Sequence, residues 1–176
     1  EERPLPLTAY VKGMNALLPD DVAVRAASIE PDGFDARRSA LGKRYVYTIE
    51  HLETRAPLTR QRAWQLFGRL DVAGMRAGAV HLVGHHDFAA FQAADCASEH
   101  AVRDVRRLEL VELAGGQIQI FVEATAFVKH MIRNFVGTLV EVGQGRREPE
   151  WVAEVLASRD RTKAGRTAPP QGLCLD

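Results

Sequence analysis

Residues 102–124 read VRDVRRLELVELAGGQIQIFVEA, and this stretch decides the fold. Val102 to Leu113 and Gln117 to Ala124 look like two long strands, and the residues Ala114-Gly115-Gly116 between them are a hairpin signal. Glutamine and isoleucine alternate from residue 117 to residue 120, as expected for a sheet with one face in water. The sequence therefore predicts a long antiparallel hairpin.

The segment after the hairpin, roughly Phe127 to Val142, is the most apolar of the chain. Its apolar residues form two rows that cover more than half of a helix circumference, so we expect a helix packed on two sides. Other helices are expected where a capping residue, a proline or an apolar stripe marks them. They are Thr8 to Leu18, Asp71 to about Val83 with Gly84 as the stop, and Glu150 to about Ser158 after Pro149.

Two earlier segments, Val22 to Ile29 and Arg44 to Ile49, have the apolar and β-branched residues of strands. A mixture of helices, strands and a hairpin in this order predicts the α+β class, with a largely antiparallel or mixed sheet and packed helices.

The composition excludes several classes of protein. The chain has 176 residues with 23 basic and 23 acidic side chains, so a nucleic-acid site would have to be a local patch. Cys96 and Cys174 are too few for a disulfide framework or a zinc pattern, which favours a reducing, cytoplasmic compartment. No run approaches the roughly 18 apolar residues of a membrane span. The first residues, EERP, lack a signal-peptide pattern and suggest a start in mid-protein.

A basic and aromatic stretch, DARRSALGKRYVY, spans residues 35–47. Guanidinium and ammonium groups bind phosphates, and an aromatic ring offers a stacking surface to an unpaired base. Such a stretch suits a nucleic-acid cleft, but a solvated charge run leading into a strand with core tyrosines explains it as well.

A second candidate site is the run AFVKHMIRN at residues 126–134. Arg133 falls at the edge of the narrow polar arc of the expected helix, where an unpaired buried charge is costly, so we expect a carboxylate partner. An ordinary ion pair at a helix edge remains the alternative.

A third candidate comprises His81, His85, His86 and Asp87. His81 and His85 are four residues apart, which predicts one helical face, and they could bind a metal such as zinc if Asp87 or another residue supplied a third ligand. The glutamate of an H-E-x-x-H pattern is missing, and exposed histidines at a helix end explain the cluster equally well.

Seven blocks in order resemble tRNA pseudouridine synthase A, the TruA family. They are NALLPDD at 15–21, FDAR with SA at 34–40, KRYVY at 43–47, GHHDF at 84–88, AFVKHMIRN at 126–134, GTLVEVG at 137–143, and TAP with GL at 167–173. The resemblance covers nearly the whole chain and implies a pseudouridine-synthase-like fold. The resemblance also accounts for the histidine cluster without a metal, because the family has a Gly-x-x-Asp-Phe turn at this place that binds none.

The resemblance implies an isomerase that converts uridine to pseudouridine at positions 38, 39 and 40 of the tRNA anticodon arm, as a homodimer without cofactor or metal. In that family an aspartate attacks a flipped-out uridine, the N-glycosidic bond breaks, and the uracil is turned and rejoined through carbon. Tyr45 matches the tyrosine that packs against the target base, and Arg133 matches the arginine that pairs with the aspartate. RNA contacts are expected at Phe34, Asp35, Ala36, Arg37, Arg38, Lys43, Arg44, Asp95, Cys96, Ala97, Ser98 and Glu99.

The catalytic aspartate of the family lies in a Gly-Arg-Thr-Asp-Ala-Gly segment that this sequence does not contain. We therefore expect residues 1–176 to be the C-terminal part of a synthase domain whose N-terminal subdomain is absent, and the isolated chain to be inactive. The alternative is a non-catalytic module for RNA binding or dimerisation.

Overall fold

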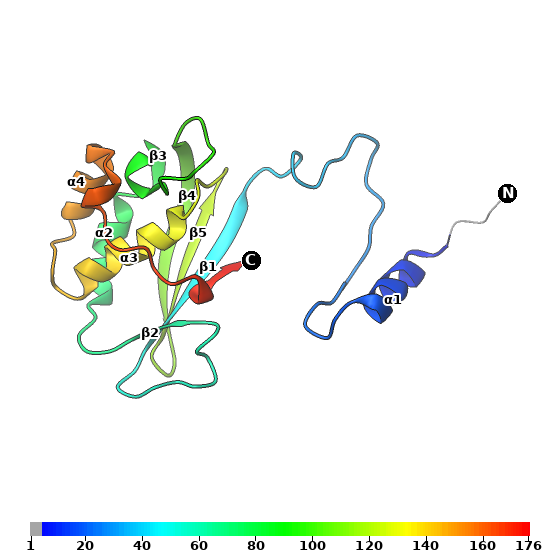
Figure 1. Cartoon of the computed structure of the whole chain (residues 1–176), viewed down its shortest axis with the longest axis horizontal. Coiled ribbons are helices and arrows are strands. Elements are labelled where there is room, and N and C mark those ends of the chain that lie inside the picture. The colour runs from blue at the N-terminus through cyan, green and yellow to red at the C-terminus, as the bar shows by residue number, and fades with distance from the viewer. Residues whose placement is uncertain (1–4) are drawn as a thin grey trace. The chain divides into compact units, whose positions relative to one another are not determined.

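The computed structural model describes residues 5–176, which fall into two compact units, residues 5–40 and residues 41–176 (Figure 1).

The first unit contains one helix, α1 (Leu7–Leu17), which confirms the helix expected at Thr8 to Leu18 to within one residue. Among the described residues α1 buries none of its side chains, and Tyr10, Met14 and Leu17 are exposed.

The strand predicted at Val22 to Ile29 is wrong, since this segment has no regular structure. A strand is held by backbone hydrogen bonds to a neighbouring strand, and no described strand pairs with this one. The side chain of Asn15 replaces such a neighbour at one point: its amide nitrogen donates to the Val24 carbonyl at 2.8 Å, and its amide oxygen accepts from the Val24 N–H at 2.7 Å.

The second unit is built on a sheet with the strand order β2-β1-β5-β4-β3, and β6 also pairs with β1. The strands are β1 (Lys43–His51), β2 (Trp64–Leu66), β3 (Gly84–Asp87), β4 (Val102–Leu113), β5 (Gln117–Ala124) and β6 (Leu173–Leu175). Only the β1–β2 pair is parallel among these strands. The expected mixed, largely antiparallel sheet is confirmed.

The hairpin of β4 and β5 is formed as predicted, with Leu110 opposite Ile120. Gly115 and Gly116 have φ of 80° and 79° in the turn, a left-handed conformation that glycine adopts without strain. The ladder shifts its register between Val105 and Arg107, which marks a bulge in β4.

Three helices cover one side of the sheet: α2 (Val72–Val80), α3 (Met131–Gly143) and α4 (Trp151–Ser158) (Figure 1). Asp71 caps α2 as predicted, accepting a hydrogen bond from the Gly74 N–H at 3.0 Å. This helix ends three residues before the expected end, because residues 81–83 form tighter turns in which each N–H donates to the carbonyl three residues earlier.

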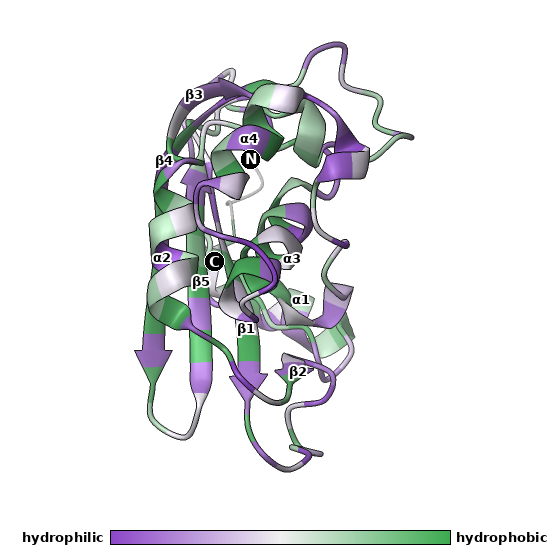
Figure 2. Cartoon of the chain, turned by 90° about the vertical axis from the view of Figure 1, so that its left-hand side faces the viewer, coloured by the Kyte–Doolittle hydropathy of each residue, from purple (hydrophilic) through white to green (hydrophobic). Residues whose placement is uncertain are grey.

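The core lies between the sheet and α3. Phe135, Val136, Leu139 and Val140 of α3 are fully buried, so the helix packed on two sides is confirmed. The facing side chains of the sheet are buried as well: Tyr47 and Ile49 of β1, and Ile120 and Val122 of β5. Figure 2 shows the hydrophobic colour along the middle of the strands and over much of α3. The helix begins at Met131 rather than Phe127, since the preceding residue turns the chain with a left-handed backbone.

Candidate functional site

A pocket of about 270 Å³ lies where β1, the start of α3 and β6 meet. Its lining comprises Tyr45, Phe127, Val128, Lys129, His130, Met131, Ile132, Arg133 and Leu173. The two residues that the sequence singled out for a catalytic site, Tyr45 and Arg133, are therefore brought to one pocket from positions far apart in the chain.

Tyr45 lies on β1, opposite Val122 of β5 and Leu175 of β6. Its half-buried ring meets the ring of Phe127 edge to face, with the centroids 5.2 Å apart and the planes at 88°. This is a favourable aromatic arrangement, and it fixes the plane of the Tyr45 ring at the pocket wall.

The next inward residue of β1, Tyr47, is a core residue. It is fully buried and its hydroxyl donates to the Pro169 carbonyl at 2.7 Å. Burial raises the pKa of Tyr47, partly opposed by the charges of Arg133 and Arg166, so this phenol stays neutral. The interpretation of the tyrosines as core residues holds for Tyr47, whereas Tyr45 lines the pocket.

Arg133 lies in the first turn of α3 and is held by the chain that crosses over that helix. Its Nε donates to the Ala168 carbonyl at 2.6 Å, and its own carbonyl accepts from the Ala168 N–H at 3.0 Å. In the part of the chain that the structure describes, no carboxylate pairs with Arg133, so the expected partner is not found there. The remaining guanidinium N–H groups are donors suited to a carboxylate.

His130 is a pocket residue that the sequence did not single out by itself. It precedes α3 with φ 64°, an uncommon conformation for a residue other than glycine. Desolvation and the nearby charges of Arg133 and Lys129 lower the pKa of His130. The imidazole is therefore mainly neutral at pH 7, and it adds little positive charge beside the two cations.

The expected RNA-contact segment at residues 95–99 is tied to the same pocket through Lys129. The Lys129 ammonium pairs with Asp95 at 2.5 Å, and its backbone N–H donates to the Cys96 sulfur at 3.4 Å. The hydrogen bond from the Lys129 side chain lowers the pKa of Asp95, and the backbone N–H of Lys129 is the main cause that lowers the pKa of Cys96 to about 7.

The rest of this loop lies beside Arg103 of β4. Ser98 accepts a hydrogen bond from an Arg103 terminal nitrogen at 3.0 Å, while Ala97 and Glu99 are exposed. Asp95 and Cys96 of this loop thus contact Lys129, a residue of the pocket lining.

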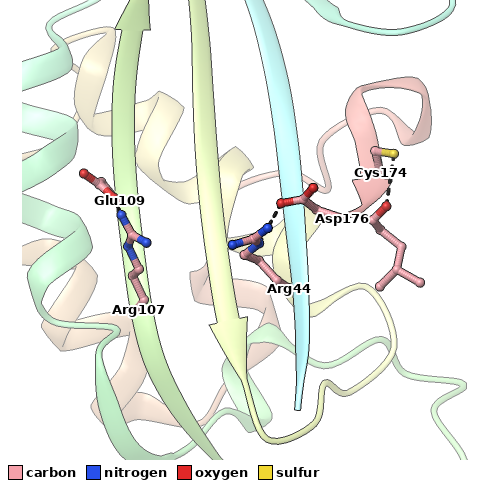
Figure 3. A network of polar contacts seen from close by, with 6 residues as sticks. Arg44, Arg107, Glu109, Cys174 and Asp176 are labelled. Carbon is pink, nitrogen blue, oxygen red and sulfur yellow. Dashed lines mark hydrogen bonds and ion pairs between the residues drawn. The ribbon is translucent and has the colours of Figure 1, made fainter. Parts of the chain in front are cut away.

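A second, open hollow of about 530 Å³ lies at the start of β1. Its lining comprises Leu41, Gly42, Lys43, Arg44, Arg106, Glu123 and Asp176. Arg44 pairs with Asp176 at 2.6 Å across the edge of the sheet (Figure 3), and Arg106 lies 4.0 Å from Glu123. The sequence pattern does not single out Arg106, because this residue is brought close to Lys43 only by the pairing of β1 and β4 with β5.

Phe34 to Arg38, another expected RNA-contact segment, lie in the first unit. Asp35 caps a turn, since its carboxylate accepts from the N–H groups of Arg37 and Arg38 at 2.9 Å and 2.7 Å. Phe34 is exposed, and Arg37, Arg38 and Ala36 are exposed beside it. This arrangement leaves one ring and two cations open to solvent.

The interpretation of His81 and His85 as one helical face is wrong. α2 ends at Val80, and His85 lies on β3 opposite Asp104. His86 bonds instead to the Val83 carbonyl at 2.9 Å, and Asp87 pairs with Arg159 at 3.2 Å. Within residues 5–176 no group of three or more His, Cys, Asp or Glu side chains is arranged to hold a metal.

None of the helices described is long and apolar enough to cross a membrane.

Comparison with known proteins adds an independent finding. Residues 79–176 match the profile of a family described as tRNA pseudouridine synthase. The chain is 55% identical over 174 residues to tRNA pseudouridine synthase A of Myxococcus xanthus, an alignment that covers 99% of this chain and 66% of that protein. It is 49% identical over 173 residues to the protein of the same name from Geotalea uraniireducens, covering 97% and 70%. The chain thus spans about two thirds of the length of these relatives.

Proposed function

This chain belongs to the tRNA pseudouridine synthase A family, and on that premise we propose that the protein carrying it isomerises uridine to pseudouridine at positions 38, 39 and 40 of the tRNA anticodon arm. The observation that carries the proposal is the pocket shared by Tyr45 and Arg133. A base that leaves its stack needs an aromatic surface and polar groups to receive it, and this pocket offers both.

Tyr45 supplies the surface for the flipped-out uracil. Its ring is half buried and buttressed by Phe127, so stacking a base on it requires no reordering of the side chain. In keeping with the family resemblance, we propose that the phenol also assists removal of the proton from the carbon that becomes bonded to the sugar.

Arg133 supplies the charge that a nucleophilic aspartate needs. A guanidinium held through Nε presents its terminal N–H groups in a fixed direction, and hydrogen bonds from them favour the ionised carboxylate. The aspartate itself corresponds to the Gly-Arg-Thr-Asp-Ala-Gly segment of the family and is no part of this sequence. In the reaction it forms a bond to the sugar carbon as the N-glycosidic bond breaks, and it leaves when the rotated uracil attacks through carbon.

The proposed RNA path runs over the loop at residues 95–99 and the hollow at the start of β1. Lys129 at the pocket and Lys43 and Arg106 at the hollow provide cations for the phosphates. Phe34 to Arg38 are proposed as a further contact with the RNA. We also propose a homodimer in the cytoplasm, working without cofactor or metal.

The test is pseudouridine formation by the full-length gene product that carries this sequence. A tRNA transcript with tritium at the 5-position of uridine releases the label when the new carbon bond forms, and nearest-neighbour analysis locates the product. Label should be released from a transcript with uridine at positions 38 to 40 and not from one with cytidine there. Tight tRNA binding without any release would instead support the non-catalytic RNA-binding module.

A further inference from the structure

The segment 164–169 lies directly against α3, backbone to backbone. A Cβ at Gly137 would overlap the Arg166 carbonyl oxygen, and a Cβ at Gly165 would lie 2.7 Å from the Gly137 carbonyl oxygen. The Gly165 N–H also donates to the Thr138 hydroxyl at 3.0 Å, which is itself bonded to the carbonyl of Asn134 at 2.8 Å. The distance between segment and helix is therefore fixed by main-chain contact.

This segment determines where the guanidinium of Arg133 points. The Nε of Arg133 donates to the carbonyl of Ala168, whose residue is fully buried. Because a guanidinium is planar, the bond at Nε also sets the direction of the two terminal nitrogens. A shift of the Ala168 carbonyl would turn Arg133 within the pocket.

Three polar side chains fix the two ends of that bond. The Thr167 hydroxyl donates to the Asn134 amide oxygen at 2.7 Å. A terminal nitrogen of Arg161 donates to the Thr167 hydroxyl oxygen at 2.9 Å and to the Asn134 amide oxygen at 3.0 Å. Asn134 follows Arg133 in the chain and Thr167 precedes Ala168. The amide of fully buried Asn134 is completed by a bond of its nitrogen to the Phe91 carbonyl at 2.7 Å.

Arg161 is a half-buried cation whose described partners are all neutral. It donates to a hydroxyl, an amide oxygen and the Ala164 carbonyl, and within residues 5–176 no carboxylate pairs with it. Desolvation lowers its pKa. The hydrogen bonds to these neutral oxygens offset part of the cost of desolvating the guanidinium, and they join α3 to the segment 164–169 through one side chain.

We propose that Asn134, Arg161 and Thr167 form a positioning network that directs the guanidinium of Arg133 into the pocket. None of the three lines the Tyr45 pocket, and their described hydrogen bonds join the two segments that hold Arg133. The catalytic consequence rests on the proposed function, whereas the control of the Arg133 geometry does not.

The first experiment removes the central hydroxyl in the full-length gene product. Thr167→Val keeps the shape of the side chain, Thr167→Ser keeps the hydroxyl, and Thr162→Val is the matched control, because the Thr162 hydroxyl bonds only to Asp160 in the described structure. Displacement of a catalytic group by about 1 Å can cost roughly 100-fold, so we expect Thr167→Val to lower the single-turnover rate by about 10- to 100-fold. The Kd for tRNA should stay within about twofold, and the serine variant and the control should match the parent.

The second experiment separates positioning from loss of structure. In an Arg133→Lys background, which lacks the Nε, Thr167→Val should lower the rate no further, since both changes remove the same interaction. Independently of activity, the Arg133 Nε–H resonance should exchange with solvent faster in Thr167→Val than in the parent. If Thr167→Val fails to fold, Arg161→Lys is measured in the same two ways.

Unchanged Nε–H exchange in these variants would overturn the positioning network, and so would a rate loss of equal size in the Arg133→Lys background. If the parent protein formed no pseudouridine but the Nε–H exchange responded as expected, the proposed function would fail and the network would stand.

Discussion

At the scale of single residues, Tyr45 and Tyr47 show how the surroundings give two identical side chains different roles. Both point inward from β1, but the Tyr47 hydroxyl is bonded to a carbonyl and its ring packs on Trp64, with the centroids 6.4 Å apart. Tyr45 instead lies half buried at the pocket wall. One tyrosine therefore serves the core and the other is free to meet a ligand.

We expect Tyr45→Phe to nearly abolish pseudouridine formation while leaving the midpoint of thermal unfolding unchanged. Tyr47→Phe is the matched control: it leaves the Pro169 carbonyl without its donor, so it should lower stability by about 1 kcal/mol and retain turnover. Tritium release and calorimetry check both variants. Normal turnover of Tyr45→Phe would contradict the assigned role.

Arg133→Ala should also nearly abolish turnover, because a nucleophilic aspartate would lose its charged partner. The loss of one charge-assisted interaction made in the transition state corresponds to roughly 100-fold or more in rate. Arg159→Ala serves as control, since this exposed arginine pairs with Asp87 and lies outside the Tyr45 pocket. Equal rates for the two variants would remove Arg133 from the active site.

Cys96 offers a test of the loop geometry by pH. Its pKa is lowered from 9.0 to about 7, so the reactive thiolate appears as the pH rises through 7. In a Cys174→Ser background, alkylation of Cys96 by iodoacetamide should be half-maximal near pH 7 in the folded protein. In urea, which removes the bond from the Lys129 N–H, the profile should move to higher pH. Identical profiles in the two conditions would show that the loop is not held as described.

At the scale of elements, α3 joins the core to the site. Its apolar rows hold it against the sheet, and its first turn presents Arg133 to the pocket. The close approach of residues 164–169 requires the absence of a side chain at one position of the helix, Gly137.

Gly137→Ala is therefore expected to destabilise the protein, although alanine is the better helix former. Forcing a methyl group into the Arg166 carbonyl should cost about 1–3 kcal/mol, which outweighs the gain of about 1 kcal/mol in helix propensity. Gly13→Ala in α1 is the matched control, because a Cβ there meets nothing within 4 Å. In denaturant unfolding, the free energy of unfolding should fall for Gly137→Ala and rise for Gly13→Ala. A rise for Gly137→Ala would refute the backbone contact.

At the scale of the whole molecule, equal numbers of acidic and basic residues hide local basic areas. Lys43, Arg44 and Arg106 gather at the start of β1, where Glu123 and Asp176 partly neutralise them. Binding of tRNA by such areas releases counterions and should weaken steeply with salt.

We expect Arg106→Ala to reduce the slope of log Kd against log salt by about one, as for the loss of one phosphate contact. Arg76→Ala is the control, since this arginine of α2 is bonded to Leu110 and Glu112 and not to the hollow. Filter binding across a salt series measures both slopes. If the slope of Arg106→Ala equals that of the parent, the RNA path does not cross this hollow.

The sequence by itself determined the helices and strands that are long enough to show a periodic pattern of apolar residues. The β4–β5 hairpin, β1, α2, α3 and α4 were predicted because alternation and helical stripes report which side of a segment is buried. Tyr45 and Arg133 were singled out from motifs alone, and their roles stay predictions.

Only the tertiary structure decided what depends on partners distant in the chain. The short strands β2, β3 and β6 exist through pairing, and Val22 to Ile29 has strand residues but no described strand to pair with. The same holds at the site: Arg106 near Lys43, His130 in a left-handed turn, and the bonds from Asn134 and Thr167 all arise where separate segments meet. The local sequence pattern indicates which side chains are buried. Which residues they contact depends on segments distant in the sequence, and only the tertiary structure brings these together.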